Sequence, residues 1–273
     1  MGLIPRVGAP AAGLPGRVFA VLVFMGVWSL VWCAVGEIWQ RRPLAPASQL
    51  PPGWSRQVPA DGARGVPPFL LIAAEAGENL EDASVTVTDE EGRPAAGTVR
   101  VAGRLVTFTP IHVLTPGMTY RVTTEAVGRG GRALTVLRWY FQVVDLAEEY
   151  WLDLSVSERP LALRVYRGRE LVRAWRASTG RPGDDTPLGV YRIQDRGRFF
   201  WSERYQEGGF FWMRLFGNYL IHSVPVDGDG RILEAEERRL GYPASHGCVR
   251  LSLEGARWLY ETVPDGALVI IRP

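Results

Sequence analysis

The sequence predicts a mainly β protein with an N-terminal membrane segment, two folded domains and one main helix near the C-terminus. Three observations lead to this prediction. Residues 18–36 form a run without a single charged side chain. Residues 84–144 alternate apolar and polar side chains in short runs separated by turn residues, which is typical of antiparallel sheets. In the last third of the chain, the apolar spacing of a helix recurs at 253–263, among segments that otherwise have the pattern of strands.

The apolar run at 18–36 has about the length that crosses a bilayer core. Arg6, Arg17 and the α-amino group precede it, so residues 1–17 are expected to remain in the cytoplasm as a short tail. We therefore predict a single-pass anchor in the cell membrane, with everything after Gly36 outside the cytoplasm. The alternative is a signal peptide cleaved at the small residues 34–36, which would give a secreted or cell-wall protein.

Residues 37–65 are predicted to form a proline-rich linker. The stretch 43–68 contains seven prolines, and chains of this kind are extended and semi-rigid, rising about 3 Å per residue. We expect the linker to lift the folded domains away from the membrane.

The composition excludes two classes of function. All 31 basic residues are arginine, so no lysine is present to form a Schiff base or to act as a general base. The net charge is +2, which does not favour nucleic acid as a partner.

The first folded domain is predicted at 66–146, as an all-β sandwich. In TYRVTTEAV, for example, Tyr120, Val122 and Thr124 share one face of a strand. The stretch LVTFTPIHVLTPGMTYRVTTEAV at 105–127 and the closing WYFQV at 139–143 resemble a bacterial Ig-like domain. The resemblance implies a spacer or positioning module.

The second folded domain is predicted at 147–273. Alternating strands are followed by a loop rich in glycine and proline at 179–189 and by a strand at 218–226 that carries His222. Ser252 is placed to cap a helix whose apolar stripe includes Ala256 and Leu259. One helix among many strands predicts a mainly β fold here as well.

Four segments in this domain resemble one enzyme family in the family's order. SHGCVRL at 245–251 is similar to the signature of L,D-transpeptidases, which have a YkuD-type catalytic domain. STG at 178–180, TPLG at 186–189 and FFWMRLFGNYLIHS at 210–223 match the family's earlier segments. The resemblance implies a mixed β-sandwich or barrel with a catalytic cysteine.

Cys248 is predicted to be the nucleophile. A free thiol is mostly protonated at neutral pH, and a neighbouring imidazole converts it to the reactive thiolate. The other cysteine, Cys33, lies in the predicted membrane span, so an intrachain disulfide is geometrically implausible. The alternative for Cys248 is an inert buried thiol.

Two histidines are candidates for the base. The resemblance implies that His222 is the general base, with its other ring nitrogen oriented by the Ser223 carbonyl. It implies that His246 supports the site.

Five further residues are expected to complete the site. The N–H groups of Gly247 and Cys248 are candidate oxyanion donors, and Ser245 is expected to hold the loop. Thr186 and Gly189 of TPLG are predicted to contact substrate. Arg250 is predicted either to pair with a substrate carboxylate or to form a structural ion pair.

Two stretches near these residues leave their roles open. Between His222 and Ser245 lie 22 residues, a few more than is usual in the family, and the extra length is predicted at 227–241 as a charged turn or helix at the rim. The aromatic stretch 199–216 is expected either to cover the substrate groove or to pack in the core.

The resemblance implies transpeptidation on peptidoglycan stem peptides. Cys248 would take the acyl group of a stem tetrapeptide and pass it to an amine, giving a 3→3 cross-link without a metal or other cofactor. The alternatives are an L,D-carboxypeptidase, an exchanger of D-amino acids, and a cell-wall binding protein without activity.

Overall fold

The computed structural model describes residues 50–273. The predicted tail at 1–17, the predicted membrane segment at 18–36 and linker residues 37–49 lie outside the described residues. Within 50–273, no helix has the length and apolar character needed to cross a membrane. Strands dominate the described residues, so the mainly β prediction is confirmed.

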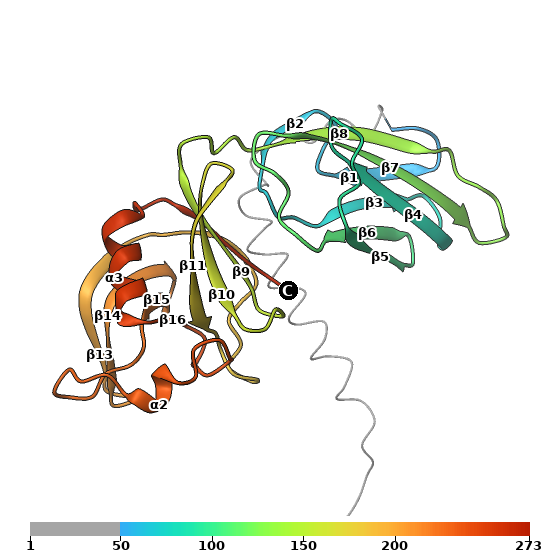
Figure 1. The fold of residues 1–273 in the computed structure, drawn as a ribbon. Helices are drawn as coiled ribbons and strands as arrows, with labels where there is room; N and C mark the ends of the chain where they lie inside the picture. The colour runs from blue at the N-terminus through green and yellow to red at the C-terminus, as the bar shows by residue number, and fades with distance from the viewer. Residues whose placement is uncertain (1–49) are drawn as a thin grey trace, which may run out of the picture. The chain divides into compact units, whose positions relative to one another are not determined.

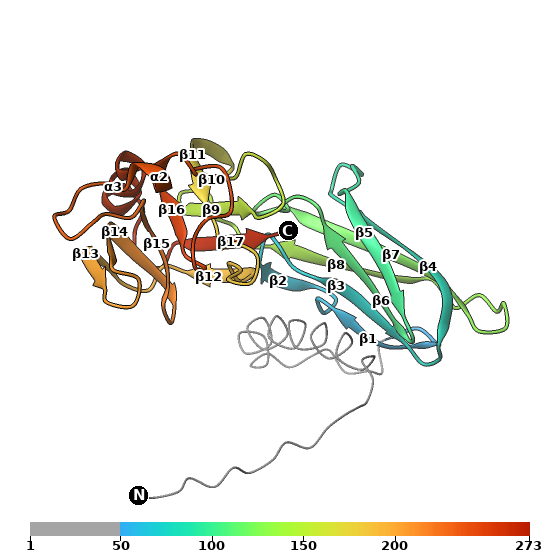
Figure 2. The same ribbon diagram turned by 90° about the horizontal axis from the view of Figure 1, so that it is seen from below.

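The first part of the described chain forms two stacked four-stranded sheets (Figures 1 and 2). One has the strand order β1-β3-β6-β5 and the other β2-β8-β7-β4. The strands are β1 (Trp54–Val58), β2 (Ala63–Val66), β3 (Ile72–Ala76), β4 (Leu80–Thr88), β5 (Gly97–Ala102), β6 (Leu105–Pro110), β7 (Thr119–Gly128) and β8 (Leu137–Val143). The predicted β-sandwich is present.

Strand β7 shows why this part of the sequence folds as a sandwich. Its side chains alternate between buried and accessible along the whole strand. Tyr120, Val122 and Thr124 are all buried, as the prediction of a shared face requires. Period-two burial gives each sheet one face for the core and one for solvent.

The sandwich begins earlier than the sequence predicted. Strand β1 lies within the predicted linker and β2 begins in it, and β1 pairs with β3. The indole Nε1 of Trp54 donates a hydrogen bond to the Thr135 carbonyl at 2.7 Å. Pro51, Pro52 and Pro59 lie outside β1, where proline interrupts no strand pairing. The linker therefore ends before Trp54 and not at residue 65.

The second part is built on one nine-stranded sheet of order β12-β17-β9-β10-β11-β16-β15-β14-β13 (Figure 1). Its strands are β9 (Tyr150–Ser155), β10 (Ala162–Arg167), β11 (Glu170–Ser178), β12 (Gly189–Arg192), β13 (Arg196–Ser202), β14 (Glu207–Phe216), β15 (Tyr219–Ser223), β16 (Val249–Leu251) and β17 (Leu268–Arg272). Two neighbouring pairs, β9–β17 and β15–β16, run parallel. The rest of the sheet is antiparallel.

Helix α3 (Leu253–Thr262) covers the strands that carry the signature residues. Ser252 caps it as predicted, since its Oγ accepts a hydrogen bond from the Gly255 N–H at 3.1 Å. Ala256 and Leu259 are fully buried in the core that α3 shares with the sheet. The shorter helix α2 (Glu234–Glu237) lies in the extra segment 227–241.

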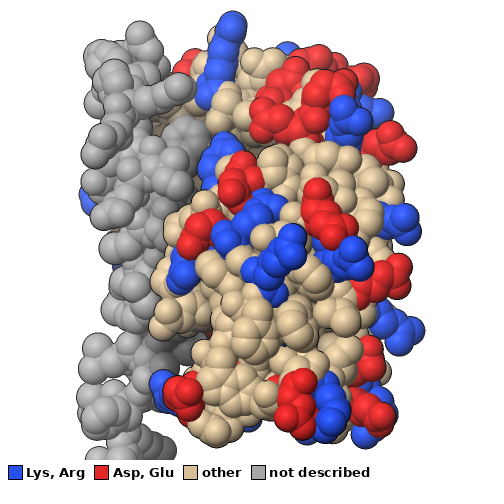
Figure 3. All heavy atoms as spheres, turned by 90° about the vertical axis from the view of Figure 1, so that its left-hand side faces the viewer, with Lys and Arg blue, Asp and Glu red and all other residues tan. Residues whose placement is uncertain are grey.

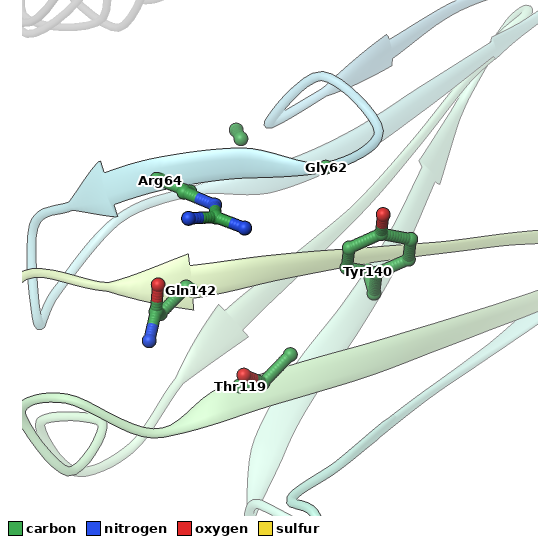
Figure 4. A pocket seen from close by; sticks show the side chains of 6 residues that line it. Gly62, Arg64, Thr119, Tyr140 and Gln142 are labelled. Atoms are coloured by element: carbon green, nitrogen blue, oxygen red, sulfur yellow. The ribbon is translucent and has the colours of Figure 1, made fainter.

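A shallow hollow of about 210 Å³ lies on the sandwich (Figure 4). It is lined by Gly62, Ala63, Arg64, Thr119, Tyr140 and Gln142. These residues belong to β2, β7, β8 and the turn before β2, so the hollow shares no residue with the signature segment.

Acidic and basic side chains are interspersed on the face of the molecule that includes α3, β13 and β14 (Figure 3). Large areas without charge separate them.

Candidate active site

The parallel pair β15–β16 brings the predicted base, His222, next to the strand that begins directly after the predicted nucleophile, Cys248. Ile221 lies opposite Val249, and His222 lies opposite Arg250. Ile221 and Val249 belong to the core beneath α3, so His222 and Arg250 point to the other face. Cys248 comes two residues before Arg250 and continues the alternation to that face. This position is diagonal to His222, and diagonal neighbours on adjacent strands are about 7–8 Å apart.

Cys248 is a free, half-buried thiol. Its Sγ lies 3.6 Å from the Asn218 carbonyl oxygen, which accepts its hydrogen bond. Burial raises the pKa of the Cys248 thiol above its ordinary value, and the charge of Glu207 raises it further. The backbone of Leu220 and the charge of Arg250 lower this pKa but offset only part of the rise. The thiol is therefore protonated in the resting protein at neutral pH.

His222 is buried in the sheet with the edge of the Phe200 ring against it, at a centroid distance of 5.0 Å. Burial, together with the charge of Arg250, lowers the pKa of His222 to about 3. The Ser223 backbone acts in the opposite direction and raises this pKa, as expected if the imidazole donates a hydrogen bond to the Ser223 carbonyl. The imidazole is neutral at neutral pH and is in the form that accepts a proton.

The Nδ1 atom of His222 is buried and has no hydrogen-bond partner within the described residues. It faces Gly209 of β14, where an added Cβ would lie 2.7 Å from it. The absent side chain at position 209 therefore makes room for the imidazole. The thiol of Cys248 bonds to Asn218 and not to His222, so proton transfer requires the thiol to leave that carbonyl. A hydrogen bond between a thiol and the imidazole that takes its proton often forms only when substrate is bound.

Short hydrogen bonds fix the signature loop. The Ser245 hydroxyl donates to the Cys248 carbonyl at 2.6 Å and accepts from the Gly247 N–H at 3.1 Å. The Thr186 hydroxyl donates to the Gly247 carbonyl at 2.9 Å and accepts from the Gly180 N–H at 2.8 Å. Segments that match the family at 178–189 thus hold the loop that presents Cys248.

The structure changes the predicted set of oxyanion donors. The Gly247 N–H is used inside the loop, where Ser245 accepts it. Of the two predicted donors, this leaves the N–H of Cys248. Gly247 has a positive φ of 114°, and a Cβ there would lie 2.6 Å from the Tyr219 ring. The position requires glycine for its backbone conformation and its close packing.

Three other predicted site residues belong to the scaffold instead. Ser223 is fully buried, and its hydroxyl accepts from the Phe210 N–H at 2.9 Å and donates to the next carbonyl along the chain. Thr186 is buried, and its hydroxyl is used on both sides by the loop. A Cβ at Gly189 would lie 2.7 Å from the Tyr191 hydroxyl, so Gly189 makes room for that ring. The structure thus shows structural roles for Thr186 and Gly189, and their predicted contact with substrate stays a prediction.

His246 is half-exposed at the edge of the site. The Tyr205 ring, from the turn between β13 and β14, stacks on its imidazole at a centroid distance of 4.1 Å and an angle of 14°. The stack covers one face of the imidazole and fixes its orientation. His246 therefore borders the site, whereas His222 lies within the sheet behind it.

Arg250 forms the structural ion pairs that the sequence left as one of two alternatives. It is buried, with Nη2 at 2.6 Å from a Glu207 oxygen and Nη1 at 2.7 Å from a Glu236 oxygen. Both terminal nitrogens are paired, so the guanidinium does not present its charge to a substrate carboxylate.

Comparison with known proteins gives the same assignment as the signature. A family model of the L,D-transpeptidase catalytic domain (YkuD) matches residues 149–271. The chain is 35% identical over 134 residues to "Putative L,D-transpeptidase YciB" of Bacillus subtilis (strain 168), a match that covers 46% of this chain and 68% of that protein. The chain belongs to the L,D-transpeptidase family.

Solved structures of L,D-transpeptidases are similar to most of this chain at low identity. One from Mycobacterium smegmatis is 20% identical, with a TM-score of 0.40, over 82% of this chain and 100% of its own. One from Mycobacterium tuberculosis H37Rv is 19% identical, with a TM-score of 0.39, over 81% of this chain and 98% of its own.

Sequence reasoning missed three residues of this L,D-transpeptidase domain. Gly209 stands in a GGFFW run that gives no sign of a neighbouring histidine. Glu207 and Glu236 are 43 and 14 residues from Arg250 in the sequence. No local pattern links positions so far apart, so the ion pairs emerge only from the fold.

Proposed function

We propose that this chain is a peptidoglycan L,D-transpeptidase in which Cys248 is the nucleophile and His222 is the general base. The observation that supports the proposal is the parallel register of β15 and β16, in which His222 lies opposite Arg250, two residues after Cys248. A stem tetrapeptide is the acyl donor, and the side-chain amine of a second stem is the acceptor. The reaction uses no cofactor, because a thioester stores the energy of the broken amide bond.

The first half-reaction forms the acyl-enzyme. The thiol proton of Cys248 passes to His222 while Sγ bonds to the carbonyl carbon between the L-centre of the diamino acid and the terminal D-residue. The Cys248 N–H donates a hydrogen bond to the oxyanion. The C–N bond then breaks, His222 gives its proton to the departing amine, and D-alanine leaves.

The second half-reaction transfers the acyl group. The acceptor amine attacks the thioester carbonyl and loses a proton to His222. The C–S bond breaks, and the thiolate takes that proton back from the imidazole. The new amide joins two stems in a 3→3 cross-link, and both side chains return to their starting state.

The resting pair is neutral in this mechanism. Burial raises the pKa of Cys248 and lowers the pKa of His222 to about 3. A thiolate and an imidazolium are therefore not populated before substrate arrives, and the proton moves as the carbonyl carbon is attacked. A neutral thiol in an exported protein is also less exposed to oxidation than a thiolate.

We further propose that residues 18–36 anchor the enzyme as a single membrane span, with 1–17 in the cytoplasm and the L,D-transpeptidase domain outside. The uncharged run and the arginines before it support this topology. The sandwich is proposed to be a bacterial Ig-like spacer, supported by its two four-stranded sheets. Together they would hold Cys248 near the peptidoglycan.

The test is turnover of muropeptides that carry a tetrapeptide stem by the full chain in detergent, followed by mass spectrometry. Cross-linked dimers in which one stem has lost D-alanine are expected with the wild type, and Cys248→Ala should form none. Tripeptide monomers alone would replace the proposal with an L,D-carboxypeptidase. Unchanged muropeptides would indicate a binding protein without activity.

A further inference from the structure

Two carboxylates from separate segments meet at one buried guanidinium. Glu207 is the first residue of β14, and Glu236 lies in α2 of the extra segment 227–241. They bind the two terminal nitrogens of Arg250 at 2.6 and 2.7 Å. Arg250 is 4% exposed, so water does not replace either partner.

The two carboxylates determine where the guanidinium lies. The remaining nitrogen of Arg250, Nε, is buried and has no hydrogen-bond partner within the described residues. A planar guanidinium bound at both terminal nitrogens is held in position and in orientation. Glu236 also pairs with Arg239 at 2.9 Å through its other carboxylate oxygen, so it joins Arg250 to the end of the extra segment.

This cluster lies next to the reacting groups. Arg250 is directly opposite His222 in the register and two residues from Cys248 on the same face. Its charge lowers the pKa of both groups, and Glu207 raises the pKa of Cys248. A change in the position of the Arg250 guanidinium, or in the negative charge beside it, therefore alters the pKa values of the thiol and the imidazole.

The segment that carries Glu236 is fastened to the domain on both sides of α2. At its start, the Val226 N–H donates a hydrogen bond to the Gly208 carbonyl of β14 at 3.0 Å. At its end, the Ser178 hydroxyl donates to the Arg239 carbonyl at 2.9 Å. A segment anchored in this way can hold a carboxylate in one place.

We propose that Glu236 is a positioning residue: with Glu207 it holds the Arg250 guanidinium in place beside Cys248 and His222, so that the extra segment 227–241 tunes the reactivity of the thiol. The inference deepens the proposed function and rests on it in taking Cys248 as the reacting group. It gives the extra segment a role in the chemistry beyond the rim of the site.

Several ionisable groups surround the thiol and the guanidinium, and each variant in the test changes only the groups that it names. They are His222 and Tyr219 of β15, Glu207 of β14, Arg250 of β16, Glu236 of α2 with its second partner Arg239, and His246 of the signature loop.

The test measures how fast iodoacetamide alkylates Cys248 in the full chain as a function of pH, with the Cys248 peptide quantified by mass spectrometry and no substrate present. Glu236→Gln keeps the shape of the side chain and removes one negative charge. Less negative charge then offsets the guanidinium, so its positive charge stabilises the thiolate more strongly. The midpoint of the alkylation profile should therefore fall by about half a pH unit. Glu234→Gln is the matched control, since Glu234 lies in the same helix and pairs with exposed Arg238; its midpoint should not move.

Two further variants keep the test decisive. Glu207→Gln removes the other carboxylate and should lower the midpoint in the same direction, which carries the test if Glu236→Gln does not fold. In an Arg250→Met background, Glu236→Gln should shift the midpoint less than in the wild type, because its effect passes through the guanidinium.

An unchanged or raised midpoint in folded Glu236→Gln, or an equal shift without Arg250, overturns the inference. The muropeptide assay on the same preparation separates the two proposals. Turnover without a shift leaves the transpeptidase proposal standing alone, and a shift without turnover overturns only the proposed function.

Discussion

His222 and Arg250 lie directly opposite each other across the parallel strands β15 and β16. The imidazole is neutral because it is buried beside a positive charge, and its pKa is lowered to about 3. The guanidinium is compensated by Glu207 and Glu236. The pair therefore combines an uncharged imidazole with a fixed charge, and the raised pKa of Cys248 keeps the nearby thiol protonated at neutral pH.

Gly209→Ala should impair catalysis without unfolding the protein. The added Cβ would lie 2.7 Å from Nδ1 of His222 and would displace the imidazole. A displacement of about 1 Å at a reacting group costs roughly 100-fold in rate, so kcat/KM should fall by about that factor. Gly228→Ala is the control, because its Cβ would make an ordinary 3.9 Å contact with Trp201. Equal activity of the two variants would show that the imidazole tolerates a side chain there.

Thr186→Val should destabilise the domain and slow the reaction. The substitution keeps the shape of the side chain but removes the hydroxyl that joins the Gly180 N–H to the Gly247 carbonyl. Leaving these buried groups without a partner costs about 1–3 kcal/mol, which urea unfolding would measure. Thr107→Val, at a half-buried position in the sandwich where the hydroxyl makes only a long 3.5 Å hydrogen bond, should stay within about 0.5 kcal/mol of the wild type. A stable Thr186→Val variant with full activity would contradict the role given to Thr186.

Stability should fall with pH below about 6.5 because of His222. Its pKa is about 3 in the folded protein and 6.5 when unperturbed, so between these values the unfolded chain binds a proton that the folded chain does not. The contribution is fully present above pH 6.5 and is lost as the pH falls, by up to about 1.4 kcal/mol per pH unit. Urea unfolding of the wild type and of His222→Gln between pH 7 and 5 checks this. Equal pH slopes for the two proteins would argue against a buried neutral imidazole.

The sequence was most informative where the residues of a motif are adjacent or close together in the chain. SHGCVRL, the upstream strand with His222 and the TPLG segment were enough to predict the family, which the comparisons confirm. The capped helix at Ser252 followed from local rules that need no tertiary context. The loop-holding hydroxyl of Ser245 was also expected, because its neighbours in sequence are its partners in space.

The rest depended on contacts between distant segments. Arg250 was left with two alternatives, since nothing near it in sequence shows that Glu207 and Glu236 reach it. The Gly247 N–H was expected to face substrate, and only the loop geometry shows that Ser245 accepts it. The first strands of the sandwich were hidden by the prolines around Trp54, because a proline-rich composition predicts a linker unless strand pairing is known.

The most direct test of the account is acylation of Cys248 by a carbapenem, followed by intact mass and peptide mapping. The β-lactam ring opens on attack, so the whole molecule should be added, at one copy per chain, on the peptide that contains Cys248. The His222→Gln variant should be acylated about 100-fold more slowly than the wild type, because it lacks the base. The Cys248→Ala variant should form no adduct. An adduct that forms without Cys248, or at an equal rate without His222, would contradict the central claim.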